Sequence, residues 1–150
     1  MKYWLMKTEA DVFSIDDLKR VKREAWTGVR NYQARNFMKE MKKGDLVLFY
    51  HSSSDPTGVA GIAKVVAEAH PDESAFDVKS DYFDSKSKRE SPLWSCVDVG
   101  FVKTLPGVIT LATLKADPKL RGMRLLEPGS RLSVQPVSEA HFKYITERLA

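Results

Sequence analysis

The chain has 150 residues, a formal net charge of +4 and 43% hydrophobic residues, which is enough for a core that needs no disulfide or metal. Its longest apolar runs, 46–50 and 59–63, are far shorter than a membrane span, and its start lacks the apolar stretch of a signal peptide. We therefore expect one soluble domain over 1–150, without a membrane partner, that is cytoplasmic, nucleoid-associated or, in a eukaryote, nuclear.

The first part of the chain predicts one strand followed by two helices. Residues 2–7 (KYWLMK) are predicted to form the strand. Ser14 can cap the first helix because Asp17 follows three residues later, as in a capping box, and this helix should end before Trp26. A second helix is expected to begin near Asn31, since apolar residues then recur at the spacing of one helical face. These residues are Ala34, Phe37, Met38 and Met41.

The remainder of the chain predicts mainly strands, at 45–50, 58–69, 94–105 and 131–135. The first of these is a continuous apolar run, which is typical of a strand buried on both faces. Residues 71–92 are polar and irregular, and form a long loop that either is functional or wraps the sheet. Helical turns are expected at 110–115 and 117–123, and Ser138 should cap a final helix. This order indicates an α+β domain built on a small, curved, barrel-like sheet.

Charge is unevenly distributed along the chain. Residues 19–43 contain nine basic and two acidic side chains, a local charge of +7, while 68–84 contain six acidic side chains and one lysine. A basic segment favours anionic partners, nucleic acid first among them, but on charge alone a solvated helix face is the favoured interpretation.

Several kinds of chemistry have no signature in the sequence. Neither a GxGxxG nor a GxxxxGK motif occurs, the three histidines are far apart, and the lone Cys96 permits no internal disulfide and is expected to pack in a strand. We therefore expect no cofactor and no metal. His51 is close in sequence to Ser52, but catalytic triads assemble from distant segments, and no GxSxG motif holds the serine. A non-enzymatic protein is the favoured interpretation.

The stretch WTGVRNY (26–32) is the strongest indication of a binding loop. Gly28 allows backbone to approach a ligand closely, and Trp26 and Tyr32 offer aromatic faces on which a planar base can stack. Arg30 and Asn31 precede a helix whose free amides favour an anion. For each aromatic taken alone, a place in the core is the favoured interpretation; their clustering in a loop favours a pocket.

A second stretch, FYHS (49–52), ends an apolar strand and switches abruptly to polar groups. Tyr50 or His51 could form a wall of the same pocket, with the Ser52 hydroxyl as a hydrogen-bonding group, although a hydrogen-bonded structural imidazole is the safer interpretation of His51. Trp4 and Trp94 are expected in the core.

Segments spread over the whole chain resemble the EVE domain family of the PUA-like superfamily. They are WLMKTE (4–9), Ser14, WTGVRNYQARNF (26–37), GDLVLFYHS (44–52), GIAKVV (61–66), DSKS (84–87), VDVGFV (97–102) and RLSVQPV (131–137). The resemblance implies a PUA-like pseudo-barrel of about five to six mostly antiparallel strands with short flanking helices. It also implies a pocket for a modified base of DNA or RNA. The sequence departs from the family pattern at three positions. The family often has proline at the positions of Ala10 and Ser85, and tryptophan at the position of His141.

The family's pocket residues can be carried over position by position to this sequence. The resemblance then implies that the pocket is lined by Trp26, Val29, Arg30, Asn31 and Tyr32 on one side and by Tyr50, His51 and Ser52 on the opposite side. Lys7 and Ser14 are expected at its rim. Phosphates are expected on the basic face, at Lys22, Arg23, Arg35 and Lys39.

Three hypotheses follow. The first is a monomeric, non-enzymatic reader of a modified base, such as methylated or hydroxymethylated cytosine, in DNA or RNA. The second is an enzyme acting on a nucleobase or nucleotide with His51 as acid or base. The third is a module that binds a protein or small molecule.

Overall fold

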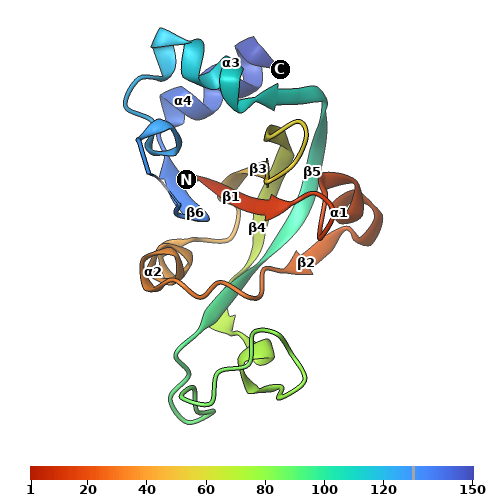
Figure 1. The fold of residues 1–150 in the computed structure, drawn as a ribbon, viewed down its shortest axis with the longest axis vertical. Helices are drawn as coiled ribbons and strands as arrows, with labels where there is room; N and C mark the ends of the chain where they lie inside the picture. The colour runs from red at the N-terminus through yellow and green to blue at the C-terminus, as the bar shows by residue number, and fades with distance from the viewer. Residues whose placement is uncertain (130) are drawn as a thin grey trace.

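The computed structural model describes residues 1–129 and 131–150, and short helices separate most of its strands along the chain (Figure 1). The strands are β1 (Tyr3–Glu9), β2 (Arg23–Ala25), β3 (Leu46–Ser52), β4 (Gly58–Pro71), β5 (Ser95–Thr110) and β6 (Val134–Val137). The helices are α1 (Ile15–Val21), α2 (Tyr32–Glu40), α3 (Leu111–Ala116) and α4 (Glu139–Tyr144). Short helical turns are η1 (Glu73–Phe76), η2 (Pro118–Leu120), η3 (Arg124–Leu126) and η4 (Ile145–Leu149).

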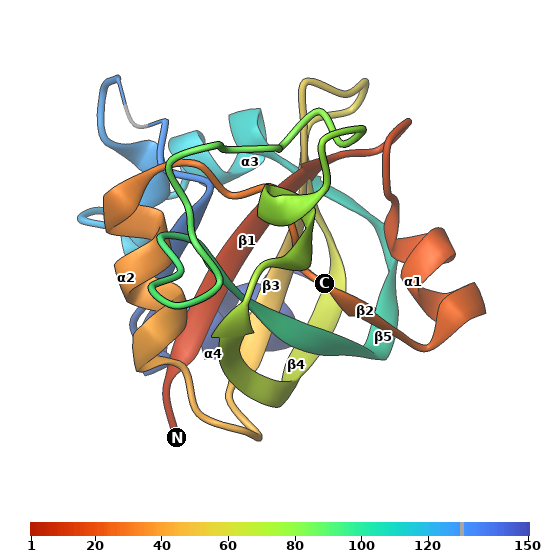
Figure 2. The ribbon, with the colours of Figure 1, turned by 90° about the horizontal axis from the view of Figure 1, so that it is seen from below.

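The described strands form one open six-stranded sheet in the order β2-β5-β4-β3-β1-β6. Only the β1–β3 pair is parallel, with Tyr3 opposite Leu46 and Glu9 opposite Ser52. The register of β4 against β5 shifts at several points, and such bulges bend and twist a sheet. Figure 2 shows β4 and β5 curving past β3 and β1. The predicted α+β pseudo-barrel with mostly antiparallel strands is confirmed.

Two hydrophobic clusters lie on opposite faces of the sheet, which explains why β3 is buried on both. Val47 and Phe49 of β3 belong to the first cluster, which α1 and α2 cover, whereas Leu48 and Tyr50 belong to the second, which α3 and α4 cover. Successive strand side chains point to opposite faces, so this alternation follows from strand geometry. In Figure 1, α3 and α4 lie together at one end of the molecule, away from α1 and α2.

Side chains at the helix starts hold α1 and α2 in place; the cap at Ser14 confirms the prediction, whereas the side chain of Asn31 was expected to face a ligand. The Ser14 hydroxyl accepts from the Asp17 amide at 3.1 Å while the Asp17 carboxylate accepts from the Ser14 amide at 2.9 Å, which completes the capping box. The Asn31 side chain accepts from the amide of Ala34 at 2.9 Å and begins α2. These caps fix where α1 and α2 begin.

The structure departs from the sequence-based elements in three places. Residues 23–25 form the edge strand β2, which the sequence analysis did not anticipate. The strand predicted at 94–105 continues to Thr110, and the one predicted at 131–135 begins only at Val134. None of the helices in the described residues has the length and hydropathy required to cross a bilayer.

Candidate functional site

A cavity of about 720 Å³ opens where the carboxyl end of β1 meets several connecting segments. Its walls come from β1 and the turn before α1, from β2 and the loop 26–30, from the end of β3, from the loop 71–92 and from the segment that enters β6. The lining residues are Lys7, Thr8, Glu9, Val12, Phe13, Glu24, Ala25, Trp26, Thr27, Gly28, Val29, Arg30, Ser52, Tyr82, Arg131 and Ser133.

Half of the residues carried over from the family resemblance line this cavity. They are Lys7, Trp26, Val29, Arg30 and Ser52. Ser52 reaches the cavity because β3 runs parallel to β1 and ends beside Glu9. The fold therefore brings the 26–30 loop and the end of β3 to one place, although more than twenty residues separate them in the sequence.

The other five carried-over residues lie outside the cavity lining, and four of them have clear structural roles. Ser14 and Asn31 cap α1 and α2. Tyr50 is 3% exposed and packs in the second hydrophobic cluster, on the opposite face of β3 from Phe49. His51 accepts a hydrogen bond at its Nε2 from the Ile15 amide at 3.1 Å.

His51 acts as a further cap for α1. Burial lowers the pKa of its imidazole, and the nearby Asp16 opposes this shift only partly. The ring is therefore neutral at pH 7, which suits a nitrogen that accepts a backbone N–H.

Tyr32 lies in a separate aromatic stack on the surface. Its ring stacks on Trp94 at 4.8 Å between centroids, and the guanidinium of Arg35 lies 4.8 Å from the Tyr32 centroid. Trp94 is 5% exposed, in line with the prediction that it belongs to the interior. Tyr32 itself is 56% exposed and stays a candidate contact beyond the cavity.

The residues expected to hold phosphates also lie outside the cavity lining. Lys22 ends α1 with a φ of 74°, and its carbonyl accepts from the Phe101 amide at 2.9 Å. Arg23 pairs with Asp98 at 2.9 Å, and Arg35 donates to the Leu93 carbonyl at 2.8 Å. Lys39 is exposed on α2. Part of the basic segment thus serves internal contacts.

Hydrogen bonds from Arg30 connect the loop 71–92 to the loop 26–30. Its guanidinium donates to the fully buried carboxylate of Asp72 at 3.0 Å and to the Tyr82 carbonyl at 2.7 and 3.1 Å. The same Asp72 carboxylate accepts from the Gly28 amide at 2.9 Å and from the Ser74 amide and hydroxyl. A single carboxylate therefore ties together two walls of the cavity.

The ionisation of Asp72 follows from these contacts. Burial alone would raise its pKa, but the hydrogen bonds from Ser74, Gly28 and Arg30 together outweigh burial and hold the pKa below the usual value. The carboxylate is charged at neutral pH and compensates the charge of Arg30.

Tyr82 forms an aromatic wall that the sequence analysis did not identify. Its ring lies across Gly28, so close that a Cβ at position 28 would be 2.6 to 2.9 Å from three ring carbons. Gly28 also has a φ of +86°, a conformation that favours glycine. Tyr82 is 44% exposed, so part of its ring faces solvent and the cavity.

The inner wall of the cavity is packed against the hydrophobic core. Trp26 is only 7% exposed and packs edge-on against Phe49, with 5.5 Å between the ring centroids. Phe13 packs on the same Phe49 ring at 6.4 Å. Phe13 and Trp26 line the cavity together with Tyr82, so three aromatic rings surround it.

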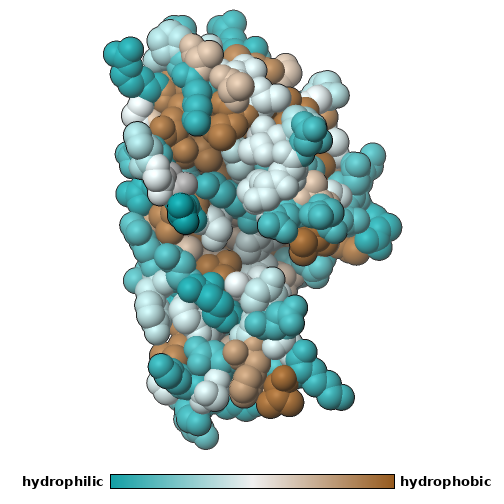
Figure 3. Space-filling view, in the orientation of Figure 1, coloured by the Kyte–Doolittle hydropathy of each residue, from teal (hydrophilic) through white to brown (hydrophobic). Residues whose placement is uncertain are grey.

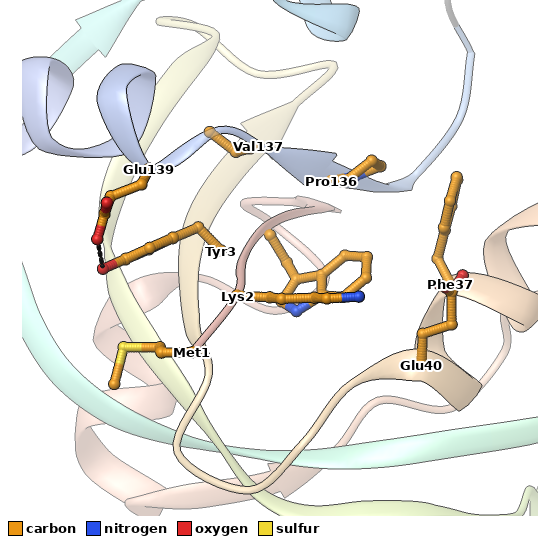
Figure 4. A pocket seen from close by; sticks show the side chains of 9 residues that line it. Met1, Lys2, Tyr3, Phe37, Glu40, Pro136, Val137 and Glu139 are labelled. Carbon is orange, nitrogen blue, oxygen red and sulfur yellow. Dashed lines mark hydrogen bonds between the residues drawn. The ribbon is translucent and has the colours of Figure 1, made fainter.

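Two further cavities hold none of the carried-over residues. One, of about 400 Å³, lies beside the amino terminus and is lined by residues that include Trp4, Phe37 and Pro136. At its edge the Tyr3 hydroxyl donates a hydrogen bond of 3.2 Å to Glu139 (Figure 4). The other, of about 440 Å³, lies among α3, η2 and η3. Figure 3 shows the largest hydrophobic area of its face over the end that carries α4.

A cysteine, a histidine and an aspartate also meet on the sheet, but they do not form a nucleophilic site. His70 lies 2.8 Å from Asp98 and 3.8 Å from the Cys96 sulfur. Burial and the neighbouring carboxylates raise the pKa of the Cys96 thiol to about 12, so the thiolate is scarce at neutral pH.

The fold and its aromatic cavity define an α+β pseudo-barrel of the PUA-like kind, and comparison with known proteins identifies the family. The model of the EVE domain matches residues 2–148, and the chain belongs to this family. It is 41% identical to human thymocyte nuclear protein 1 over 95% of this chain and 72% of that protein, and 41% identical to the chicken protein over 66% of its length.

Solved structures agree with this assignment. A Pseudomonas syringae protein superposes with a TM-score of 0.94 at 48% identity, covering 96% of this chain and 97% of that one. The human THYN1 protein in complex with DNA containing 5-methylcytosine superposes with a TM-score of 0.91 at 40% identity, covering 97% of this chain and 95% of that chain.

Proposed function

We propose that this protein is a non-enzymatic reader that accepts one modified base of a nucleic acid, 5-methylcytosine or its hydroxymethyl form, into the cavity between β1 and the loop 26–30. The observation that carries this proposal is the cavity of about 720 Å³ with Phe13, Trp26 and Tyr82 in its walls. Binding pockets for small ligands measure about 300–1,000 Å³. The cavity therefore has room for a base and part of its backbone.

Aromatic walls suit a base that has left its stack. Stacking on an aromatic side chain contributes about 1–3 kcal/mol per base, and extrusion of a base costs a few kcal/mol, least in a single strand. The half-exposed ring of Tyr82 can offer a face to a base, whereas the deeply packed Trp26 supports the pocket floor. The human relative seen with 5-methylcytosine DNA supports the choice of ligand.

An enzymatic role for His51 gains no support from the geometry. Its ring does not line the cavity, and its Nε2 is occupied by the Ile15 amide. We also propose that the protein acts as a monomer, in the compartment that holds the nucleic acid, and that RNA is the alternative to DNA as its partner.

Binding of labelled DNA and RNA oligonucleotides, single- and double-stranded, with cytosine, 5-methylcytosine or 5-hydroxymethylcytosine at one position, tests this function. Fluorescence anisotropy of the wild type should show tighter binding of one modified strand. Tyr82→Ala should remove this preference and weaken binding by about 5- to 150-fold, the equivalent of one lost stack. Phe83→Ala is the matched control, because Phe83 is a similarly exposed aromatic neighbour outside the cavity lining.

Equal binding of modified and plain strands by the wild type would refute the reader function. A small molecule or protein ligand would then be the better candidate.

A further inference from the structure

The cavity of the proposed base pocket is lined by cationic as well as aromatic residues. Lys7 comes from β1, while Arg131 and Ser133 come from the segment that enters β6, and all three line the same cavity as Tyr82 and Trp26. The residues expected to hold phosphates from the sequence lie elsewhere, so these cations were not anticipated as a group.

Backbone pairing holds the cationic part of the lining together. The Lys7 amide donates to the Ser133 carbonyl at 2.8 Å, which continues the antiparallel pairing of β1 with β6. Residues that face each other across two antiparallel strands project to the same face of a sheet. Lys7 and Ser133 are therefore neighbours, and Arg131, two residues before Ser133 in the sequence, lines the same cavity.

The charges of Lys7 and Arg131 are not committed to an internal partner. In the parts of the chain that the structure describes, neither side chain forms an ion pair. Arg30, by contrast, is already held by Asp72 and the Tyr82 carbonyl. The cavity thus has one structural cation and two that can meet an anion.

Burial makes Lys7 the stronger of the two. Its Nζ lies 5.7 Å from the centroid of the Tyr50 ring, and desolvation lowers the pKa of its ammonium group. An anion that replaces the lost water would be attracted with little screening. Two carboxylates, Glu9 and Glu24, also line the cavity, but both are exposed, and solvent and salt screen their repulsion of an anion.

We propose that Lys7, Arg131 and Ser133 form a seat for the phosphodiester group adjoining the bound base. This inference rests on the proposed reader function, since it takes the base to occupy the aromatic side of the same cavity. Two cations and a hydroxyl offer charge-assisted hydrogen bonds to the phosphate oxygens, so the nucleotide would be held at both ends.

The test uses a single-stranded DNA with one 5-methylcytosine, in which a neutral methylphosphonate replaces the linkage 5′ or 3′ of that nucleotide, or a distant linkage. In the wild type, one adjoining replacement should weaken binding about tenfold, and the distant one should have little effect. Lys7→Met and Arg131→Gln should each weaken binding of the unmodified backbone, and should lose the sensitivity to the adjoining methylphosphonate.

The dependence of affinity on salt gives a second readout. Each phosphate contact contributes about 0.7 to the slope of log K against log salt for a single strand, so removal of the Lys7 charge should reduce the slope by about that amount. Lys115→Met and Arg121→Gln are the matched controls, because both residues lie around the separate cavity by α3 and η2. Thermal unfolding followed by circular dichroism verifies that every variant is folded.

The outcomes separate the two proposals. If the preference for 5-methylcytosine persists but adjoining and distant methylphosphonates act alike, the phosphate seat is overturned and the reader stands. If the wild type shows no preference for 5-methylcytosine, the reader fails and the seat fails with it, because no base then fixes the position of the strand. If the free mononucleotide 5-methyl-dCMP binds as tightly as the strand, the seat takes a terminal phosphate and the phosphodiester assignment is overturned.

Discussion

Replacement of Gly28 by alanine should damage the pocket through two separable effects. The first is backbone strain, because a residue with a Cβ at a φ of +86° is disfavoured by about 1–2 kcal/mol. The second is a collision, since the new Cβ would be 2.6 to 2.9 Å from the Tyr82 ring carbons, where carbon atoms prefer about 3.5–4.0 Å. The ring must move by roughly 1 Å to restore that separation.

The Tyr82 backbone cannot readily follow this movement. Its carbonyl is held by two hydrogen bonds from the Arg30 guanidinium. Strain from overpacking is about 1–3 kcal/mol, so Gly28→Ala should lower the free energy of unfolding by about 2–5 kcal/mol in total.

Urea unfolding of a double-mutant cycle separates the two effects. In a Tyr82→Ala background the collision is absent, and Gly28→Ala should then cost only the backbone part, about 1–2 kcal/mol. Gly44→Ala is the control for the backbone part alone, because Gly44 has a φ of +97° and nothing lies within 4 Å of its would-be Cβ.

Purely additive effects of Gly28→Ala and Tyr82→Ala would refute this reasoning, because they would show that the ring does not lie across Gly28. The same would follow if Gly28→Ala were no more destabilising than Gly44→Ala.

Three further predictions concern the pocket floor, its anchor and the buried thiol. Trp26→Ala should lower the free energy of unfolding by about 3–5 kcal/mol, since it removes a ring packed on Phe49, whereas Trp26→Phe should cost less; urea unfolding measures both. The pKa of Asp72 is depressed in the folded state, so its stabilisation is present above the ordinary pKa of about 3.9 and is lost as pH falls below it. Asp72→Asn, which leaves Arg30 unpaired, should cost about 3–5 kcal/mol at pH 7, and the cost should fall progressively as pH drops below about 3.9 toward the depressed pKa of Asp72; a cost that does not change with pH would contradict the assignment. Cys96, with a pKa raised to about 12, should react with iodoacetamide at pH 8 only after unfolding in urea, and rapid labelling of the native protein would contradict its burial.

Local signals in the sequence predicted the helix starts and the central strand correctly. The cap at Ser14 depends on residues three positions apart, the start of α2 follows from the spacing of its apolar residues, and the burial of β3 follows from a continuous apolar run. The edge strand β2 was missed because its three residues, REA, carry no strand pattern of their own and pair with β5 some 75 residues away, as Arg23 does with Gly100 and Asp98.

The candidate site was harder to predict because its walls are joined by contacts between distant segments. Strand alternation already implies that Tyr50 and His51 face opposite ways, so both could not form one wall. The role of Arg30 could not be inferred, since its partner Asp72 is 42 residues away. Tyr82 lies in a loop that the sequence analysis identified only as functional or wrapping.

The uneven charge of the sequence is partly cancelled in the fold, and this changes what the basic segment can do. Arg30 of the basic segment pairs with Asp72 of the acidic one, and Arg23 pairs with Asp98. These pairs reduce both the long-range attraction for nucleic acid and the repulsion expected from the acidic loop. They also fix the loop 71–92 against the loop 26–30 before any ligand arrives. The loops therefore lose much of their conformational entropy on folding, and lose less of it when a ligand binds. Recognition should depend on the preformed cavity more than on the overall charge of the surface.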